Sequence, residues 1–358
     1  MSKRFQNIFF FFGLAVLALM VSQLDFADVW EHVRHAGYWF IAVVALWAFL
    51  YLFNTLSWYI IIRSGNPSRK IKFLWLYKVT VSGFALNYAT PGGLMGGEPY
   101  RIMALAPYIG TEKASASVIL FAMTHIFSHF WFWLASIVLF VCTQPVSIPM
   151  ALLLCATGSF CLLAIWFFLS GYRKGLAFRA MNLLQHLPFV KKWAAAFIER
   201  HRDNLDHIDQ QIAALHNQNP KTFFSAVMSE FTCRVCSALE IYFVLRVLMT
   251  HVSYADCILI LAFTTLFANM LFFMPLQLGG REGGFLMSVK GLAMSTDAAI
   301  LVALLVRIRE LIWTAIGLLL IKVEGDTKEI AKGDTEEITK GDTKEIAKGD
   351  TEEIAKKE

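Results

Sequence analysis

Long apolar stretches alternate with short polar connections along most of the chain. An apolar run of about 20 residues can cross a bilayer as a helix, and seven runs approach or exceed that length, at about residues 8–24, 38–62, 115–142, 149–170, 223–248, 256–274 and 298–321. Two weaker segments, 73–89 and 281–296, are short or polar for a full crossing. We therefore expect an all-α fold: a polytopic transmembrane helix bundle with seven or eight crossings and two re-entrant or broken helices.

Two stretches within this bundle are rich in helix-breaking residues. The first reads Pro-Gly-Gly-Leu-Met-Gly-Gly-Glu-Pro-Tyr-Arg over 91–101, and the second reads Pro-Leu-Gln-Leu-Gly-Gly-Arg-Glu-Gly-Gly over 275–284. Because hydrocarbon cannot hydrogen-bond an open backbone, such breaks are tolerated where the chain is buried in protein or lines a wet cavity. Paired breaks of this kind point to the binding site of a transporter. We expect the two stretches to share one cavity.

Composition and charge agree with a membrane protein and indicate its orientation. Of the 358 residues, 57% are hydrophobic and 16% are charged, against about a quarter charged in soluble domains. Lys3 and Arg4 precede the first apolar run and no small-residue cleavage site follows it, which favours an uncleaved first helix with a cytoplasmic N-terminus. The connections over 63–78 and 171–221 are basic and should be cytoplasmic too. This bias explains much of the positive charge, so we expect no nucleic-acid partner.

Two segments differ from the spans. Within about 172–221, apolar residues recur at helical spacing, which predicts an amphipathic cytoplasmic segment that lies on anionic lipid or packs on the protein's own loops. Residues 322–358 repeat an octad, Gly-Asp-Thr-Lys-Glu-Ile-Ala-Lys, with small changes. One isoleucine per octad cannot build a core, so we expect a disordered low-complexity tail. The chain thus divides into a membrane domain, 1–321, and a tail that could bind a partner; a homo-oligomer is also open.

The first broken stretch offers groups suited to an anion. Glu98 and Arg101 are spaced i,i+3, and Pro99 suits the first turn of a helix. A glycine-rich approach to a helix N-terminus presents backbone N–H groups to an anion such as a phosphodiester. The alternative is a tightly turned loop with a structural ion pair. The candidate headgroup-binding residues here are Gly92, Gly93, Gly96, Gly97, Glu98 and Arg101, with Asn87 and Tyr88 as additional candidates.

The second broken stretch and the last span supply further charges. Gly279 and Gly280 precede Arg281 and Glu282, so backbone or ligand can approach these charges closely. Charge inside a bilayer is costly and faces the bundle interior. In the last span we choose Arg307 as an added cavity cation, near Arg309 and Glu310.

Three further groups of polar residues lie in the spans. Glu230 and Arg234 are spaced i,i+4 and should neutralise each other, whereas Glu240 has no obvious partner on its own helix and could protonate or join the cavity. His125 and His129 have a spacing that can bind zinc, but they lack a nearby acidic ligand and are better interpreted as packing residues. The sequence therefore predicts no metal site and no cofactor.

The order of these motifs resembles a known family. Pro-Gly-Gly-x-x-Gly-Gly-Glu-x-x-Arg at 91–101, Gly-Gly-Arg-Glu-Gly-Gly at 279–284 and an arginine in the last span are similar to the transmembrane region of lysylphosphatidylglycerol synthases, a flippase-like family. The resemblance covers about residues 5–321 and implies a module that moves a phospholipid or glycolipid between leaflets. It also implies that Glu98, Arg101, Arg281, Glu282 and Arg307 line the lipid cavity.

This pattern is compatible with two functions. The first is a lipid flippase or lipid transporter of a bacterial inner membrane, which moves an anionic phospholipid or related lipid through a charged cavity. The alternative is a membrane-embedded transferase in which Glu98 or Glu282 acts as general base on a lipid-linked substrate. Bifunctional family members continue into an aminoacyl-transferring domain, whereas this sequence continues into octads, so we expect no aminoacylation.

Overall fold

The structure is a computed structural model of the chain. It describes residues 26–65, 71–89, 96–171, 220–270, 280–292 and 296–322, together with positions 7, 11, 14, 15, 18 and 210. All elements within these ranges are α-helices, in agreement with the predicted fold class. The first span, the cytoplasmic segment and the tail lie mostly outside the described residues, so the predictions for them stay predictions.

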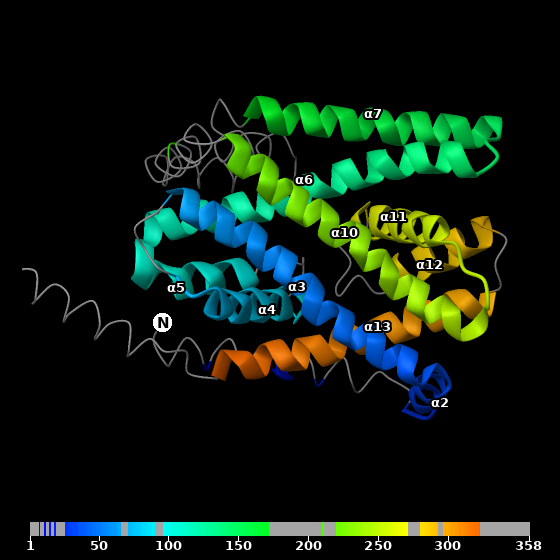
Figure 1. Ribbon diagram of the computed structural model, residues 1–358, viewed down its shortest axis with the longest axis horizontal. Helices are drawn as coiled ribbons and strands as arrows, with labels where there is room; N and C mark the ends of the chain where they lie inside the picture. The colour runs from blue at the N-terminus through cyan, green and yellow to red at the C-terminus, as the bar shows by residue number, and fades with distance from the viewer. Residues whose placement is uncertain are drawn as a thin grey trace, which may run out of the picture. The chain divides into compact units, whose positions relative to one another are not determined.

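Five long helices form the body (Figure 1). They are α3 (Tyr38–Gly65), α6 (Thr111–Thr143), α7 (Ile148–Gly171), α10 (Pro220–Leu248) and α13 (Thr296–Lys322), and α2 (Phe26–Ala36) precedes them. Three helical stretches among the described residues are long and apolar enough to cross a membrane: Tyr38–Gly65, Thr111–Thr143 and Ile148–Leu169. α10 and α13 have the length of spans but carry more charged residues, because they supply most of the ionic groups in the interior.

Four short helices form two pairs, one beside each broken stretch. α4 (Phe73–Ala89) leads to α5 (Gly97–Ile109), and α11 (Tyr254–Met270) leads to α12 (Gly280–Gly291). The 17 residues of α4 and of α11 extend about 25 Å at 1.5 Å per residue, short of the roughly 30 Å of a hydrocarbon core. The run expected as a span at 256–274 is helical over Tyr254–Met270 within the described residues, and it packs against α12.

The two halves of the chain repeat one order of helices. Among the described helices, the order long, short, short, long occurs in α3, α4, α5 and α6 and again in α10, α11, α12 and α13, while α2 and α7 lie outside it. The leading helices α3 and α10 pack antiparallel, because Asn54 meets Glu230 near the middle while Trp47 meets Glu240 toward one end. An antiparallel pairing of equivalent helices is the arrangement of inverted repeats.

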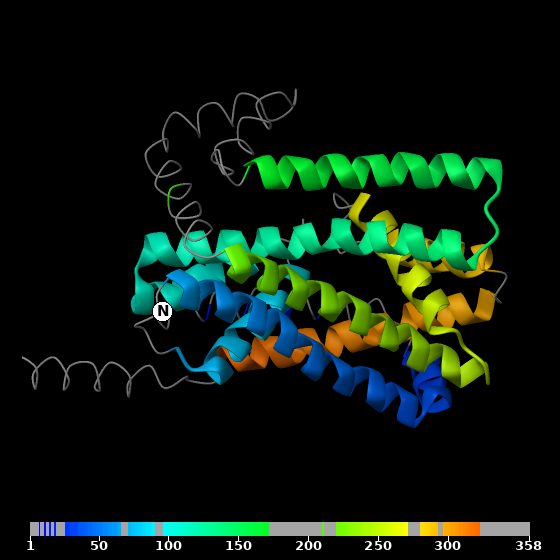
Figure 2. The same ribbon diagram turned by 45° about the horizontal axis from the view of Figure 1, so that its top comes forward.

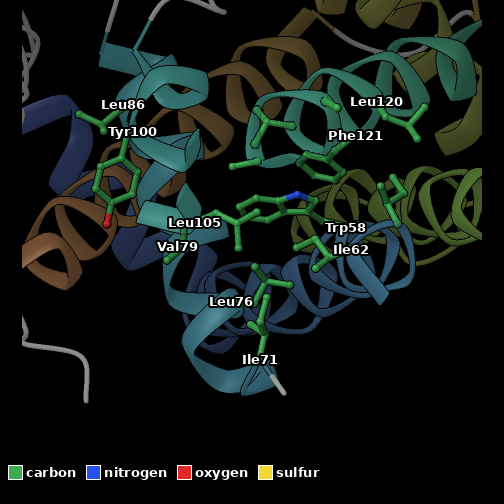
Figure 3. Packing of buried hydrophobic residues seen from close by; sticks show 14 of the residues in the cluster. Trp58, Ile62, Ile71, Leu76, Val79, Leu86, Tyr100, Leu105, Leu120 and Phe121 are labelled. Atoms are coloured by element: carbon green, nitrogen blue, oxygen red, sulfur yellow. The ribbon is translucent and has the colours of Figure 1, made fainter. Parts of the chain in front are cut away.

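The apolar core lies between the long helices. In Figure 3, Trp58 of α3 stacks on Phe121 of α6, with ring centroids 5.7 Å apart, and Leu76 and Leu105 pack beside them from α4 and α5. α7 lies at the edge of the bundle along α6 (Figure 2), and its apolar side chains are largely exposed: Leu152, Leu153, Phe160, Leu162, Leu163 and Trp166. An exposed apolar face of this kind suits contact with lipid tails.

Glycines allow three close helix contacts. A Cβ at Gly97 of α5 would overlap Gly83 O of α4, and a Cβ at Gly284 of α12 would lie 3.0 Å from Thr264 Cα of α11. At Gly317 of α13 a Cβ would lie 2.9 Å from Val81 O. Small residues at these crossings let helix backbones approach closely, as in other membrane bundles.

We expect Gly317→Val to destabilise the protein because the new side chain meets the α4 backbone, which cannot move aside alone. The cost should be roughly 1–3 kcal/mol, the usual penalty of overpacking, seen as a lower apparent melting temperature in detergent. Gly291→Ala is the matched control, since a Cβ there meets nothing within 4 Å. Equal melting temperatures for both variants would contradict the close contact.

Candidate functional site

The α4–α5 hairpin brings the residues of the first motif together. The Asn87 side chain bridges its two helices: Oδ1 accepts a bond from Gly97 N at 2.7 Å, and Nδ2 donates to Glu98 Oε1 at 3.0 Å. The same Glu98 oxygen accepts a bond from Arg101 Nη1 at 3.1 Å. The predicted i,i+3 pair is therefore present, and Asn87 is part of the same network. Tyr88 is partly buried on α4.

Arg101 lies deep in the protein, with 1% of its surface exposed. Its guanidinium carbon is 4.6 Å from the ring centroid of Phe84 and 5.3 Å from that of Phe121. The close approach to α4 depends on Gly83, where a Cβ would overlap the guanidinium. Arg101 Nη2 reaches Thr80 O only at 3.4 Å, and Arg101 Nε and Glu98 Oε2 have no hydrogen-bond partner. A guanidinium with unused donors is a group that a carboxylate or a phosphate can bind.

The structure leaves part of the predicted site undescribed. Gly92, Gly93 and Gly279 lie outside the described residues, as do the side chains of Arg281 and Glu282. Gly96 and Gly97 are buried at the start of α5, and Gly280 begins α12. The expectation that the two broken stretches share one cavity therefore stays a prediction.

A second ionic cluster joins α10 and α13. Arg309 Nε and Nη2 donate to the two carboxylate oxygens of Glu240 at 2.6 and 2.9 Å, and Glu310 lies 3.7 Å from Arg309 Nη1. Trp47 of α3 donates to Glu240 Oε2, and its ring lies 4.0 Å from the Arg309 guanidinium carbon. Glu240 thus has its partner on another helix. Arg307, the arginine chosen from sequence, is only partly buried, whereas Arg309 is 3% exposed.

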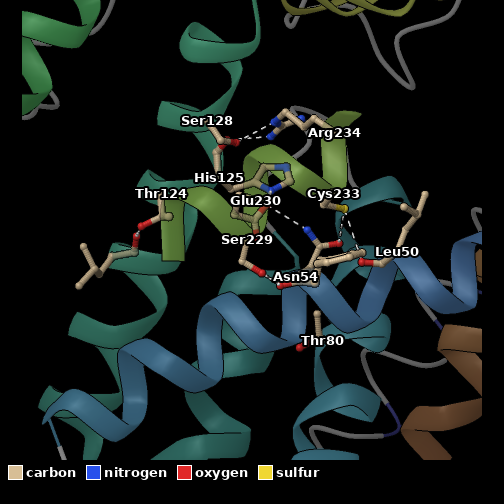
Figure 4. Close-up of polar contacts among 12 residues, drawn as sticks. Leu50, Asn54, Thr80, Thr124, His125, Ser128, Ser229, Glu230, Cys233 and Arg234 are labelled. Atoms are coloured by element: carbon tan, nitrogen blue, oxygen red, sulfur yellow. Dashed lines mark hydrogen bonds and ion pairs between the residues drawn. The ribbon is translucent and has the colours of Figure 1, made fainter. Parts of the chain in front are cut away.

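A third cluster joins α3, α6 and α10 (Figure 4). Glu230 Oε2 accepts a bond from Asn54 Nδ2 at 3.0 Å and lies 2.7 Å from His125 Nδ1. Arg234 donates instead to Ser128 Oγ and to the His125 carbonyl, both at 2.7 Å. Glu230 and Arg234 interact electrostatically, as expected of two charges that offset each other, but their hydrogen bonds go to residues of other helices. His125, expected to be a packing residue, is the ionisable partner of Glu230.

Breaking the Glu240–Arg309 pair should be costly, because it would leave Glu240 as an uncompensated buried charge. We expect Arg309→Met to cost about 3–5 kcal/mol and to lower the apparent melting temperature and the monodisperse fraction in detergent. The double variant Glu240→Gln/Arg309→Met removes both charges and keeps an acceptor for Trp47, so it should recover most of the loss. A double variant as unstable as the single one would contradict a charge effect.

Comparison with known proteins agrees with the motifs found in the chain. No curated protein sequence matches it. The sequence pattern of the family described as "Lysylphosphatidylglycerol synthase TM region" matches residues 8–317, which include both broken stretches and every described helix except the last residues of α13. The chain is a membrane protein that belongs to the lysylphosphatidylglycerol synthase transmembrane-region family.

Proposed function

We propose that the protein is a lipid flippase or lipid transporter of a bacterial inner membrane, with a cytoplasmic N-terminus, and that it moves an anionic phospholipid or related lipid between leaflets. The observation that carries this proposal is Arg101, a buried guanidinium with an unpaired Nε–H inside a helical hairpin of a membrane protein. Holding such a charge away from water costs free energy, and a charge that is kept inside a membrane protein despite this cost suggests a function. A lipid phosphate offers the oxygen acceptors that its unused donors lack.

The arrangement of Glu98 supports binding that can be reversed. Glu98 shares one oxygen with Asn87 and Arg101, and its side chain is 18% exposed while that of Arg101 is 2% exposed. Glu98 therefore lies on the accessible side of the pair. An arriving phosphate would compete with this carboxylate for the guanidinium, and Glu98 would restore a neutral pair once the headgroup has left.

The repeated order of helices supports access from both leaflets. We place the basic 63–78 connection in the cytoplasm, so α3 runs inward and the α4–α5 hairpin enters from the cytoplasmic side. The antiparallel pairing of α3 with α10 then directs the α11–α12 hairpin inward from the outer side. Paired hairpins from opposite sides are a known basis for alternating access to a central site.

Reconstitution in liposomes with a fluorescent anionic lipid tests the transport proposal. We expect the wild type to exchange the lipid between leaflets and Arg101→Gln to slow the initial rate about tenfold or more, since a charge-assisted bond contributes about 1.5–3 kcal/mol. Glu98→Gln should alter the rate as well. Arg63→Gln is the matched control, because Arg63 is exposed and also lies over a tyrosine ring.

Rates that are the same for the wild type and both hairpin variants would refute a transport role for the hairpin. Lipids extracted from the same liposomes should be chemically unchanged after incubation with lipid-linked donors. A newly modified lipid would instead support the membrane-embedded transferase.

Cysteine labelling tests the proposed orientation. In a cysteine-free background, Ser147→Cys between α6 and α7 should react with an impermeant maleimide added to intact cells. Thr111→Cys at the start of α6 should react only after the membrane is opened, as should Thr343→Cys in the tail. Labelling of Thr111→Cys in intact cells would contradict entry of the α4–α5 hairpin from the cytoplasm.

A further inference from the structure

The His125–Glu230 pair is a buried ionisable group that the proposed headgroup site does not use. Glu230 is 0% exposed, and its Oε1 has no hydrogen-bond partner. By contrast, 30% of the His125 side chain is exposed, so a proton can reach its ring. When Glu230 is ionised, its Oε2 accepts the His125 Nδ1–H, which leaves the other imidazole nitrogen able to take a proton. Histidine is the side chain best suited to exchange a proton near neutral pH.

The charges around this pair nearly cancel. Arg234 and Cys233 face it from α10, His129 from α6 at 5.7 Å between ring centroids, and Asn54 from α3. Glu230 and Arg234 balance with His125 neutral, and Glu98 balances Arg101 in the hairpin. One added proton therefore gives these two clusters together one net positive charge.

The pair is physically linked to the headgroup site through two aromatic rings. Phe84 of α4 lies 4.6 Å from the Arg101 guanidinium carbon and 5.7 Å from the His125 ring. Phe121 of α6 lies 5.3 Å from the guanidinium carbon and 6.5 Å from the same imidazole. Arg101 is also close enough to act electrostatically on both His125 and Glu230. Where water is excluded, two charges interact far more strongly than they do at the same distance in bulk solvent.

We propose that the His125–Glu230 pair is a proton-binding site linked to the headgroup site, so that an anionic headgroup at Arg101 and one proton at the pair bind together. The proton offsets the negative charge that the headgroup brings, so the hairpin pair and the His125–Glu230 cluster together carry no net charge either when empty or when fully loaded. This inference rests on the proposed function. By linkage, each ligand raises the affinity for the other. The protein would therefore carry the lipid and the proton across the membrane together, with no net charge moved.

Binding measurements on the full-length protein in detergent test the linkage. The probe is dioctanoylphosphatidylglycerol, with zwitterionic dioctanoylphosphatidylcholine as the uncharged comparison, over roughly pH 5 to 8. We expect affinity for the anionic probe to fall about tenfold per pH unit above the midpoint of the pair, with uptake of about one proton per bound lipid in weak buffer. The zwitterionic probe should show neither effect.

Two substitutions should remove the pH dependence with opposite results. Glu230→Gln leaves Arg234 uncompensated and supplies the positive charge permanently, so binding should be tight at every pH. His125→Gln removes the proton acceptor, so binding should be weak at every pH. His129→Gln, one helical turn from His125, should keep the wild-type profile. General damage to the fold would weaken binding in both Glu230→Gln and His125→Gln, which separates it from the predicted effect.

The two proposals can fail separately. Transport of the anionic lipid by a wild type whose binding does not depend on pH, or a His125→Gln variant with the wild-type profile, would overturn the proton linkage and leave the transport function standing. Proton-linked binding without any movement of the lipid in liposomes would instead overturn the transport function.

Discussion

The structure depends on one constraint: where water is excluded, each charge and each open backbone group must be satisfied by the protein itself. Three ionic clusters meet this requirement to different degrees, with partners from different helices. The same groups that solve this problem also hold the bundle together, since α13 is tied to α10 by Arg309 and Glu240, and α6 to α10 by His125 and Glu230. The polar interior is thus a structural framework as well as a candidate route for a headgroup.

The extent to which these clusters are satisfied separates their roles. Both oxygens of Glu240 are bonded, by a guanidinium in bidentate geometry and by an indole, so this cluster has little capacity for a ligand. Arg101, Glu98 and Glu230 each keep an atom without a partner. A buried polar atom without a hydrogen bond lowers the stability of a protein. Among the described residues, Arg101 and Glu98 lie in the α4–α5 hairpin, and Glu230 lies on α10 beside α6.

Local patterns along the chain were enough to predict helices and contacts between near neighbours. The helix over 73–89 has the bounds expected of it, and the i,i+3 spacing of Glu98 and Arg101 predicted the ion pair that the hairpin contains. The sequence could not show contacts between distant helices. The i,i+4 spacing predicted that Arg234 offsets the charge of Glu230, but it could not show that the hydrogen-bond partners of Glu230 are Asn54 and His125. Likewise the hydropathy of the run at 256–274 could not show that its described part, α11, packs against α12. Spacing alone cannot show which of Arg307 and Arg309 is the more deeply buried, because this depends on where Glu240 lies.

The bridge made by Asn87 has a mechanical consequence. Because the Asn87 amide joins the last turn of α4 to the first turn of α5, the two helices of the hairpin cannot separate at their tip without losing these two hydrogen bonds. The two helices of the hairpin should therefore move together as one rigid unit. At the α5 end the hairpin joins α6 at Gly110, whose φ is +85° and where a Cβ would have no atoms within 4 Å. A small rotation at that joint would carry Glu98 and Arg101 together, with their mutual geometry intact.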